Sequence, residues 1–373
     1  MKIKKVEAKL VSIPLEEPKY FSNVTIKSRK YLITKISTDA GITGWGITFY
    51  VGRDTKLIVE NMLQPLLIDE DPNYVEDLWQ KMFNKTFRAG RRGVYLRAIS
   101  AVDIALWDIK CKTCNMPLYK LLGGYKKSIP VYITGGYYSL KGDMNEVEAI
   151  TKEMEENVKQ GFLGAKIKVG AVDISIDLDR MKAARKVLGN DRKLYIDVNN
   201  GWKLHQMTPK LINTLEEIGL DWIEEPFMPD TIEETIKFKE KTNIPIAGGE
   251  VLATRWDFKQ LLESDSVDIW QPDVSVLGGI TEWNKVMNMA LLWDIPVAPH
   301  AVHEIHAHLA AACPGNQIYT LEYFDTTGDT FNYGKLLKKP LKAKDGYLQL
   351  SDEPGVGVEF NEELVENYEV KNI

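Results

Sequence analysis

Eight short apolar segments recur at regular intervals through the sequence between residues 131 and 321. They cover residues 131–134, 165–169, 194–198, 222–225, 244–248, 267–271, 295–298 and 318–321, and amphipathic segments of helical period separate them. Strands that are apolar throughout are typical of parallel sheets covered on both faces. The alternation therefore predicts a closed parallel barrel of the α/β class. A doubly wound sheet also alternates, but it needs fewer strands, and no G-x-G-x-x-G follows the first one here.

The residues on either side of the barrel predict a second, smaller domain. Residues 2–13 and 31–38 alternate apolar and polar side chains, and a further strand-like run covers residues 41–46, which together indicate a small antiparallel sheet. Helical patterns follow at residues 54–67, 73–83 and 94–112. We expect an N-terminal α+β domain over residues 1–125, the barrel over 126–325, and a C-terminal segment over 326–373 that packs back on the N-terminal domain.

Charge and composition narrow the classes of partner. The net charge is −6, and no basic run is long enough to neutralise a nucleic-acid backbone or an anionic membrane. Residues 1–15 lack the unbroken apolar core of a signal peptide, and no stretch approaches the roughly 20 apolar residues of a membrane span. We therefore expect a cytoplasmic protein without nucleic-acid or membrane partners. A C-x-x-C at residues 111–114 ends a helical run without a second pair, which favours a structural role over zinc or redox chemistry.

Ionisable side chains stand at the ends of the predicted barrel strands, where the active sites of such barrels gather. In chain order they are Lys166, Lys168, Asp197, Glu224, Glu250, Asp273, His300 and Glu322. Asp197, Glu224 and Glu250 end neighbouring strands, so the three carboxylates should converge and raise one another's pKa values. A hard divalent cation would resolve this repulsion, and an all-oxygen site suits Mg²⁺, with Mn²⁺ as a substitute.

Groups able to transfer protons flank this carboxylate cluster on both sides. Lys166 and Lys168 are two residues apart on one strand, so they point the same way. Two adjacent ammonium groups depress each other's pKa, which would make one lysine usable as a base. Asp273 and His300 lie on the other side. A substrate bound between the two pairs could lose a proton on one face and receive one on the other.

Six motifs in this order resemble the mandelate racemase subgroup of the enolase superfamily. They are K-x-K at 166–168, D-x-N at 197–199, W-I-E-E-P at 222–226, G-G-E at 248–250, Q-P-D at 271–273 with G-G-I at 278–280, and A-P-H at 298–300. The resemblance covers nearly the whole chain and implies a modified TIM barrel, (β/α)7β, with an N-terminal α+β capping domain that the C-terminal tail completes. Asp273 argues against the members that carry Lys there, such as muconate cycloisomerases and dipeptide epimerases.

The resemblance also implies roles for individual residues. It assigns magnesium binding to the three clustered carboxylates, the base to Lys168 with Lys166 assisting, and a dyad to Asp273 and His300. It implies that Glu322 hydrogen-bonds the substrate carboxylate and that Asn199 contacts substrate. It further implies a small-molecule carboxylate substrate and a homo-oligomer. N-terminal loops close over the substrate in this family, and here they contain Tyr20, Phe21, Tyr50 and Arg53.

Three functions remain in competition at this point. Residues 298–308 look closest to acid-sugar dehydratases of the galactarate and talarate type, which indicates a lyase that forms a 2-keto-3-deoxy acid. The same residues would serve a racemase or epimerase of a 2-hydroxy acid, and a barrel without catalysis is the remote third. Four of the five histidines lie between residues 300 and 308, but Ala307 interrupts the H-E-x-x-H spacing of a zinc site. We expect His303, His306 and His308 to pack or to form hydrogen bonds.

Overall fold

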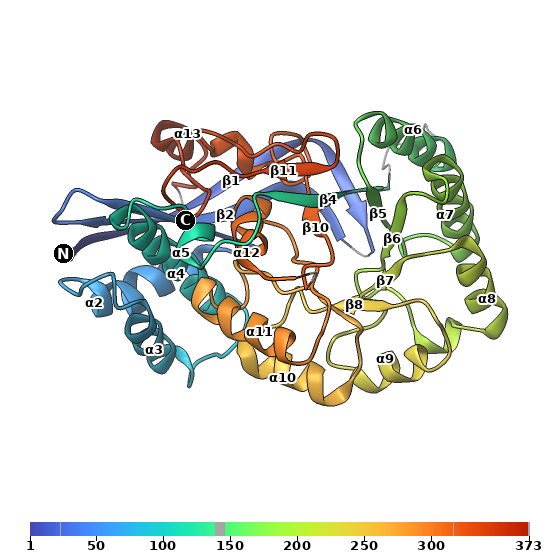
Figure 1. Ribbon diagram of the computed structural model, residues 1–373, viewed down its shortest axis with the longest axis horizontal. Helices are drawn as coiled ribbons and strands as arrows, with labels where there is room; N and C mark the ends of the chain where they lie inside the picture. Colours follow the sequence, from blue (N-terminus) through green and yellow to red (C-terminus); the bar gives the residue numbers. More distant parts are fainter. Residues whose placement is uncertain (23, 139–145, 316, 372–373) are drawn as a thin grey trace.

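A three-stranded antiparallel sheet opens the chain, in a computed structural model that describes residues 1–22, 24–138, 146–315 and 317–371 (Figure 1). Its strands are β1 (Ile3–Phe21), β2 (Val24–Thr38) and β3 (Thr43–Phe49), in that order. The first strand runs well beyond the predicted end at residue 13. Pro14 and Pro18 lack the N–H that a regular ladder needs, and the pairing register shifts between Pro14 and Lys19 to accommodate them.

The helices that follow pack against this sheet. They are α1 (Arg53–Ile58), a π-helical turn (Val59–Leu63), α2 (Gln64–Leu67), α3 (Val75–Thr86), α4 (Val94–Thr113) and α5 (Leu118–Leu121). The close packing of α4 on β3 depends on two glycines. A Cβ atom at Gly44 would lie 2.1 Å from the Ala105 carbonyl oxygen, and one at Gly46 would lie 1.9 Å from that of Ala101. No other residue would let the helix and strand approach so closely.

The barrel is built from parallel strands with β10 and β4 as neighbours, as the eight apolar segments predict. Its strands are β4 (Ser128–Gly135), β5 (Gly164–Lys168), β6 (Lys193–Asp197), β7 (Trp222–Glu224), β8 (Ile246–Gly248), β9 (Ile269–Trp270) and β10 (Leu321–Tyr323). The predicted seventh strand is reduced to Val297, which pairs with Trp270 on one side and Ile318 on the other. Because β10 pairs with β4, the ring closes.

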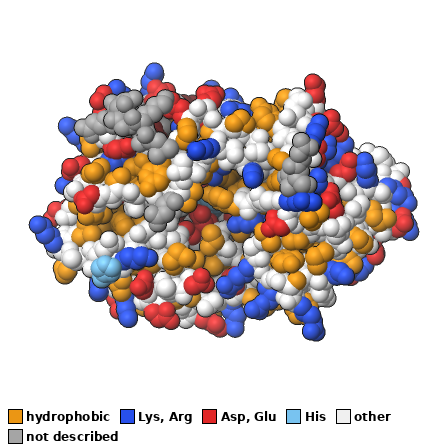
Figure 2. All heavy atoms as spheres, turned by 180° about the vertical axis from the view of Figure 1, so that it is seen from behind, with side chains coloured by type: hydrophobic (Ala, Val, Ile, Leu, Met, Phe, Trp, Pro, Cys, Tyr) orange, Lys and Arg blue, Asp and Glu red, His pale blue; other side chains and the backbone are white. Residues whose placement is uncertain are grey.

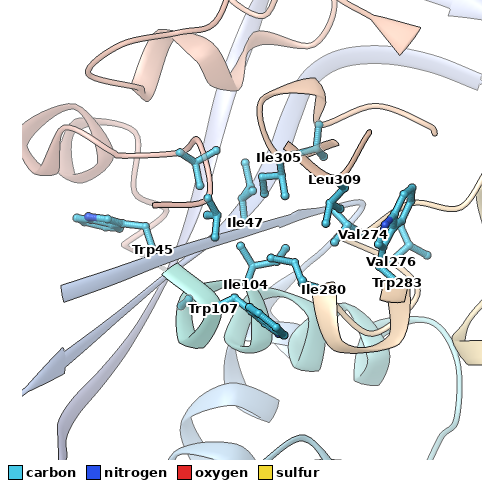
Figure 3. Close-up of a cluster of buried hydrophobic side chains, with 14 of the residues drawn as sticks. Trp45, Ile47, Ile104, Trp107, Val274, Val276, Ile280, Trp283, Ile305 and Leu309 are labelled. Atoms are coloured by element: carbon cyan, nitrogen blue, oxygen red, sulfur yellow. The ribbon is translucent and has the colours of Figure 1, made fainter. Parts of the chain in front are cut away.

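Seven helices surround the barrel. They are α6 (Glu146–Lys159), α7 (Ile174–Leu188), α8 (Pro209–Ile218), α9 (Ile232–Lys239), α10 (Thr254–Ser264), α11 (Ile280–Leu292) and α12 (His303–Ala312), among the residues described. Figure 3 shows the apolar cluster where Ile47 of β3 and Ile104 of α4 meet Ile280 and Ile305 of the barrel. The indole N–H of Trp107 also donates to Thr281 Oγ1 at 2.9 Å. The capping domain is therefore anchored beside the segments that follow the sixth and seventh strands.

The C-terminal segment returns to both parts of the molecule. The strand β11 (Tyr347–Gln349) pairs with β4 of the barrel rather than with the N-terminal sheet. After the 3₁₀ turn (Asn332–Leu336) and α13 (Glu362–Asn367), the tail reaches the capping domain. There Tyr368 accepts a hydrogen bond from the Ser12 N–H at 3.0 Å, and Val370 donates to the Leu10 carbonyl at 2.9 Å.

The β1–β2 hairpin extends from the capping domain to the barrel (Figure 1). The Tyr138 N–H, just after β4, donates to the Tyr20 carbonyl at 3.0 Å, and the rings of Phe21 and Tyr137 lie 5.7 Å apart. Figure 2 shows a hollow near the middle of the face seen from behind, with acidic side chains inside it. Within the described ranges, no helix has both the length and the apolarity to cross a membrane.

Candidate active site

Three carboxylates converge at the ends of adjacent barrel strands. Asp197 ends β6, Glu224 ends β7 opposite it in the register, and Glu250 follows β8. One carboxylate oxygen from each lies within 4.8 Å of the other two. Asp197 and Glu224 are fully buried, and Glu250 Oε2 accepts no hydrogen bond from the residues described, although His300 Nε2 lies 3.3 Å away. Clustered, buried oxygen ligands of this kind fit a hard divalent cation such as Mg²⁺.

The two lysines of β5 are ion-paired with this cluster. Lys166 Nζ lies 2.5 Å from Glu224 Oε1 and 2.7 Å from Glu322 Oε1, and Lys168 Nζ donates to Asp197 Oδ2. Burial has the largest single effect on the pKa of Lys168 and lowers it, as Lys166 does, but Asp197, Tyr137 and Glu250 together raise it by more. The pKa values of both lysines are raised. The expected depression of the Lys168 pKa is thus absent in this arrangement, because Asp197 raises this pKa by more than Lys166 lowers it.

His300 lies at the opposite end of the carboxylate cluster. Its Nδ1 is hydrogen-bonded to Asp273 Oδ2 at 2.8 Å, so its Nε2 faces the cluster, 3.3 Å from Glu250 Oε2. Asp273 Oδ1 accepts from both the N–H and the hydroxyl of Ser275, each at 2.7 Å. Burial opposes protonation of His300, but Glu250, Glu322 and Asp273 raise its pKa to about 10. The ring is therefore protonated at neutral pH.

A second buried histidine, His306, fixes the segments that hold this dyad. Its Nδ1 donates to the Ala301 carbonyl at 2.6 Å, and its Nε2 accepts from the Val274 N–H at 3.1 Å. These partners are the residues directly after His300 and Asp273. Burial lowers the pKa of His306 to about 4, so the ring is neutral and can donate and accept at the same time. The predicted hydrogen-bonding role of this histidine thus has specific partners.

Glu322 contacts protein groups on each side. It accepts hydrogen bonds from Thr134 Oγ1 at 2.6 Å and from the Ala301 N–H at 2.8 Å, besides its ion pair with Lys166. Although burial favours its neutral form, Lys166 and His300 lower its pKa to about 2. The ion pair with Glu322 orients Lys166. The predicted hydrogen bond between Glu322 and a substrate carboxylate stays a prediction, and it would require the protonated carboxyl group.

Asn199 and the second glutamate of W-I-E-E-P lie beside the cluster. The Asn199 N–H donates to Asp197 Oδ1 at 2.8 Å, while its buried side-chain oxygen has no donor in the part of the chain that is described. That free acceptor is compatible with a ligand contact. Glu225 accepts from Asn200 Nδ2 at 2.7 Å and does not belong to the group of carboxylates that could share a cation.

Trp222 and Gln271, two residues of the quoted motifs to which the sequence assigned no site role, hold Glu224 in place. Gln271 Nε2 donates to Glu224 Oε2 at 2.6 Å, and the Trp222 indole donates to the same oxygen at 3.2 Å. Trp222 also stacks on Tyr195 with ring centroids 3.6 Å apart. Because Trp222 is two residues before Glu224, strand alternation could have placed it on the inner face.

Side chains of the capping domain cover both ends of the cluster. The Lys168 ammonium lies 5.3 Å from the ring centroid of Phe21, and the ring of Phe49 lies 6.0 Å from that of His300. Tyr50 follows Phe49 and accepts a hydrogen bond from Arg29 at 3.2 Å. Arg53 is exposed at the start of α1. Of the expected loop residues, Phe21 is therefore the one beside the lysines.

Comparison with known protein families shows to which family the chain belongs. Residues 5–123 match the family described as "Mandelate racemase / muconate lactonizing enzyme, N-terminal domain", and residues 149–364 match "Enolase C-terminal domain-like". The chain therefore belongs to the mandelate racemase and muconate lactonizing enzyme family of the enolase superfamily. The resemblance seen in the six motifs and the fold that it implied are both confirmed.

Individual relatives cover more than one reaction. The arabinonate dehydratase of Saccharolobus solfataricus is 36% identical over 91% of this chain and 90% of its own length. The D-galactarolactone cycloisomerase of Agrobacterium fabrum is 31% identical over 99% of each. The structure of L-talarate/galactarate dehydratase from Salmonella typhimurium LT2, liganded with Mg and L-lyxarohydroxamate, has a TM-score of 0.87 at 29% identity, covering 99% of this chain and 93% of its own. The family thus includes both lyases and isomerases.

Proposed function

We propose that this protein is a magnesium-dependent acid-sugar dehydratase. It would remove the proton alpha to a carboxylate, eliminate the β-hydroxyl as water, and give a 2-keto-3-deoxy acid. One observation carries the proposal: Lys168 and His300 contact opposite ends of the carboxylate triad, at Asp197 and at Glu250. A substrate held between them would meet a proton acceptor on one side and a proton donor on the other.

Asp197, Glu224 and Glu250 are the residues that would hold Mg²⁺. When bound, the ion would stabilise the negative charge that develops on the substrate carboxylate as the alpha proton leaves. Lys166 would add a second positive charge beside the same oxygens, held there by Glu322. Both effects are needed, because the proton alpha to a carboxylate is only very weakly acidic.

The protein's own groups would move two protons. Lys168 would be the base, because a cation held by Asp197 would relieve the ion pair that raises the pKa of Lys168 and so favour the neutral amine. This amine takes the alpha proton, and the C–H electron pair becomes the new C=C bond. His300 Nε2 gives its proton to the β-hydroxyl, so the C–O bond breaks and water leaves. The enol that remains rearranges to the 2-keto acid. Asp273 keeps the His300 ring in the orientation that aims Nε2 at the cluster.

The alternative is a racemase or epimerase that uses the same residues. In that reaction a neutral His300 must also serve as a base in one direction. The hydrogen bond between His300 Nδ1 and the Asp273 carboxylate stabilises a protonated ring and so favours the acid role. The dehydratase relatives support the same choice. The cycloisomerase relative keeps the isomerase class in competition.

The test is a screen of aldonic and aldaric acids in heavy water, with detection of 2-keto acids. We expect a 2-keto-3-deoxy product that chelation abolishes and Mg²⁺ restores. His300→Asn should block this product while Lys168 still exchanges the alpha proton of the substrate for deuterium. If the wild-type protein instead accumulates a deuterated alpha-epimer and no keto acid, the isomerase alternative replaces the dehydratase.

A further inference from the structure

The barrel segment that follows Asp273, the partner of His300, is hydrogen-bonded to the capping domain. The indole N–H of Trp79 on α3 donates to the Gly278 carbonyl at 2.7 Å. The Gly278 N–H donates in turn to the hydroxyl of Ser100 on α4 at 2.9 Å. These bonds join the two domains, but they lie several residues beyond Asp273 in the chain.

Thr48 of β3 forms a hydrogen bond much closer to the dyad. Its side chain is fully buried, and its hydroxyl donates to the Ser275 carbonyl at 2.7 Å. Ser275 is also fully buried, and both its N–H and its hydroxyl donate to Asp273 Oδ1. Among the described residues, the Ser275 carbonyl has no other hydrogen-bond donor. A chain of hydrogen bonds therefore runs from Thr48 in the capping domain, through Ser275, to the dyad.

The burial of Ser275 makes this hydrogen bond important for the position of the residue. A buried carbonyl that loses its donor is unfavourable, so the peptide unit of Ser275 would shift if the Thr48 hydroxyl were removed. The two groups that hold Asp273 belong to the same residue and would move with it. The residue after Thr48 is Phe49, whose ring lies 6.0 Å from the His300 ring. The strand that covers the imidazole thus also fixes the residue that holds its carboxylate partner.

We propose that Thr48 is a positioning residue for the general acid, through which the capping domain aligns the dyad of Asp273 and His300. Thr48 acts through Ser275 and not by contact with the reacting atoms. The inference rests on the proposed dehydratase function, in which His300 protonates the leaving hydroxyl. Elimination then depends on the docking of β3 against the barrel. Proton abstraction by Lys168 does not depend on this hydrogen bond.

The first test replaces the hydroxyl of Thr48 by a methyl group of similar shape, in Thr48→Val. With Mg²⁺ and an active sugar acid, we expect dehydration to fall about 10-fold, the effect of one lost hydrogen bond. Alpha-proton exchange in heavy water should stay at the wild-type rate. Thr48→Ser keeps the hydroxyl and should restore most of the dehydration. Thr34→Val is the matched control, because Thr34 is fully buried on the neighbouring strand β2 and its hydroxyl has no partner among the described residues.

A double-mutant cycle with Ser275→Ala tests whether Thr48 acts through Ser275. This change removes the hydroxyl that donates to Asp273 but keeps the carbonyl that accepts from Thr48. If the two residues form one chain, the combined variant should lose less dehydration than the product of the two single losses. Losses that multiply would show that Thr48 acts independently of Ser275 and would contradict the proposed route.

The side-chain NMR signal of His300 gives a readout that needs no turnover. In protein labelled with ¹⁵N at histidine, the Nδ1 proton that is hydrogen-bonded to Asp273 can be assigned by its loss in His300→Asn. We expect Thr48→Val to shift or broaden this signal, and Thr48→Ser and Thr34→Val to leave it in place. If Thr48→Val does not fold, as judged by circular dichroism, Thr48→Ala takes its place in each comparison.

Two outcomes would overturn the positioning role of Thr48. One is an unchanged His300 signal in a folded Thr48→Val protein, and the other is an equal loss of dehydration and alpha-proton exchange. The same loss in Thr34→Val would attribute the effect to packing of the sheet and would also contradict the proposal. If wild-type protein dehydrates no acid sugar, the dehydratase proposal fails, while the His300 signal still decides whether Thr48 positions the dyad.

Discussion

The two ends of the carboxylate triad are held in different ways. At the Asp197 end, the ammonium groups of Lys166 and Lys168 reach the carboxylates on long, flexible side chains and are positioned by ion pairs. At the Glu250 end, the His300 ring is held by Asp273, and Asp273 is held in turn by two hydrogen bonds from Ser275. His306 then connects the backbones that follow both members of the dyad.

This difference indicates which step of the reaction a substitution at each end should affect. The position and charge of the lysines depend on the charge of the carboxylates around them, so this end responds to whatever binds there. The histidine end depends on hydrogen bonds between groups of the protein itself. We therefore expect variants at the lysine end to affect proton abstraction, and variants at the histidine end to affect elimination while abstraction continues.

Lys168→Met should have the largest effect. Removing the proton acceptor should lower dehydration by at least about 10³-fold and also stop deuterium exchange at the alpha carbon. Methionine is of similar length, so circular dichroism should show an intact fold. Lys193→Met, at the exposed start of the neighbouring strand β6, is the control and should keep full activity. Near-normal turnover by Lys168→Met would show that another group is the base.

Asp273→Asn should impair elimination by His300 and leave proton abstraction by Lys168 intact. Asparagine can still accept from Ser275, but it cannot hold a protonated His300 as a carboxylate does. We expect dehydration to fall by about 10²- to 10⁴-fold, the usual range for a lost general acid. Alpha-proton exchange in heavy water, measured by NMR, should remain within a few-fold of wild type. An equal loss of exchange would mean that the two ends do not act independently.

Much of this fold could be predicted because its information is local. The barrel strands can be recognised in the sequence as short apolar runs, and alternation along each strand places Lys166 and Lys168 on the same face. The predictions were least accurate where pairing overrides local pattern. The hairpin strand β1 continues through two prolines because β2 pairs with it on both sides of the shift in register. Val297 has little strand geometry of its own and is held by its two neighbours.

The site residues that sequence reasoning missed depend on contacts across long stretches of chain. Thr134 donates to Glu322, 188 positions later in the sequence, and Gln271 donates to Glu224, 47 positions earlier. No periodicity connects such pairs. His306 was visible as one of four clustered histidines, but its partners Val274 and Ala301 follow from how two loops meet. The strand-end residues could be found because the barrel itself brings them together.

His306→Gln should weaken the histidine end less than Asp273→Asn does. Glutamine can replace one of the two backbone hydrogen bonds but cannot match both distances, so the loops carrying Asp273 and His300 lose their fixed spacing. We expect about a 10-fold fall in dehydration with unchanged alpha-proton exchange, the cost of about one hydrogen bond. His303→Gln is the matched control on the same helix, because His303 donates to the distant Leu341 carbonyl. An equal loss in both variants would indicate general destabilisation of α12.

The smallest effect is on stability, and it concerns the neutral state of His306. Burial lowers its pKa from 6.5 to about 4, so below pH 6.5 the unfolded chain takes up a proton that the folded protein does not. The stability that this histidine contributes is therefore complete above pH 6.5. It is lost as the pH falls toward 4, and the total loss is up to about 3 kcal/mol.

Urea unfolding of wild type and His306→Gln at pH 7.5 and pH 5.0 measures this pH-dependent contribution of His306 to the free energy of unfolding. The loss of unfolding free energy between the two pH values should be smaller in the variant by about 2 kcal/mol. Identical pH dependence in the two proteins would mean that His306 is not held neutral in the folded state, and that the bridge between the two loops is not the rigid element on which the contrast between the two ends rests.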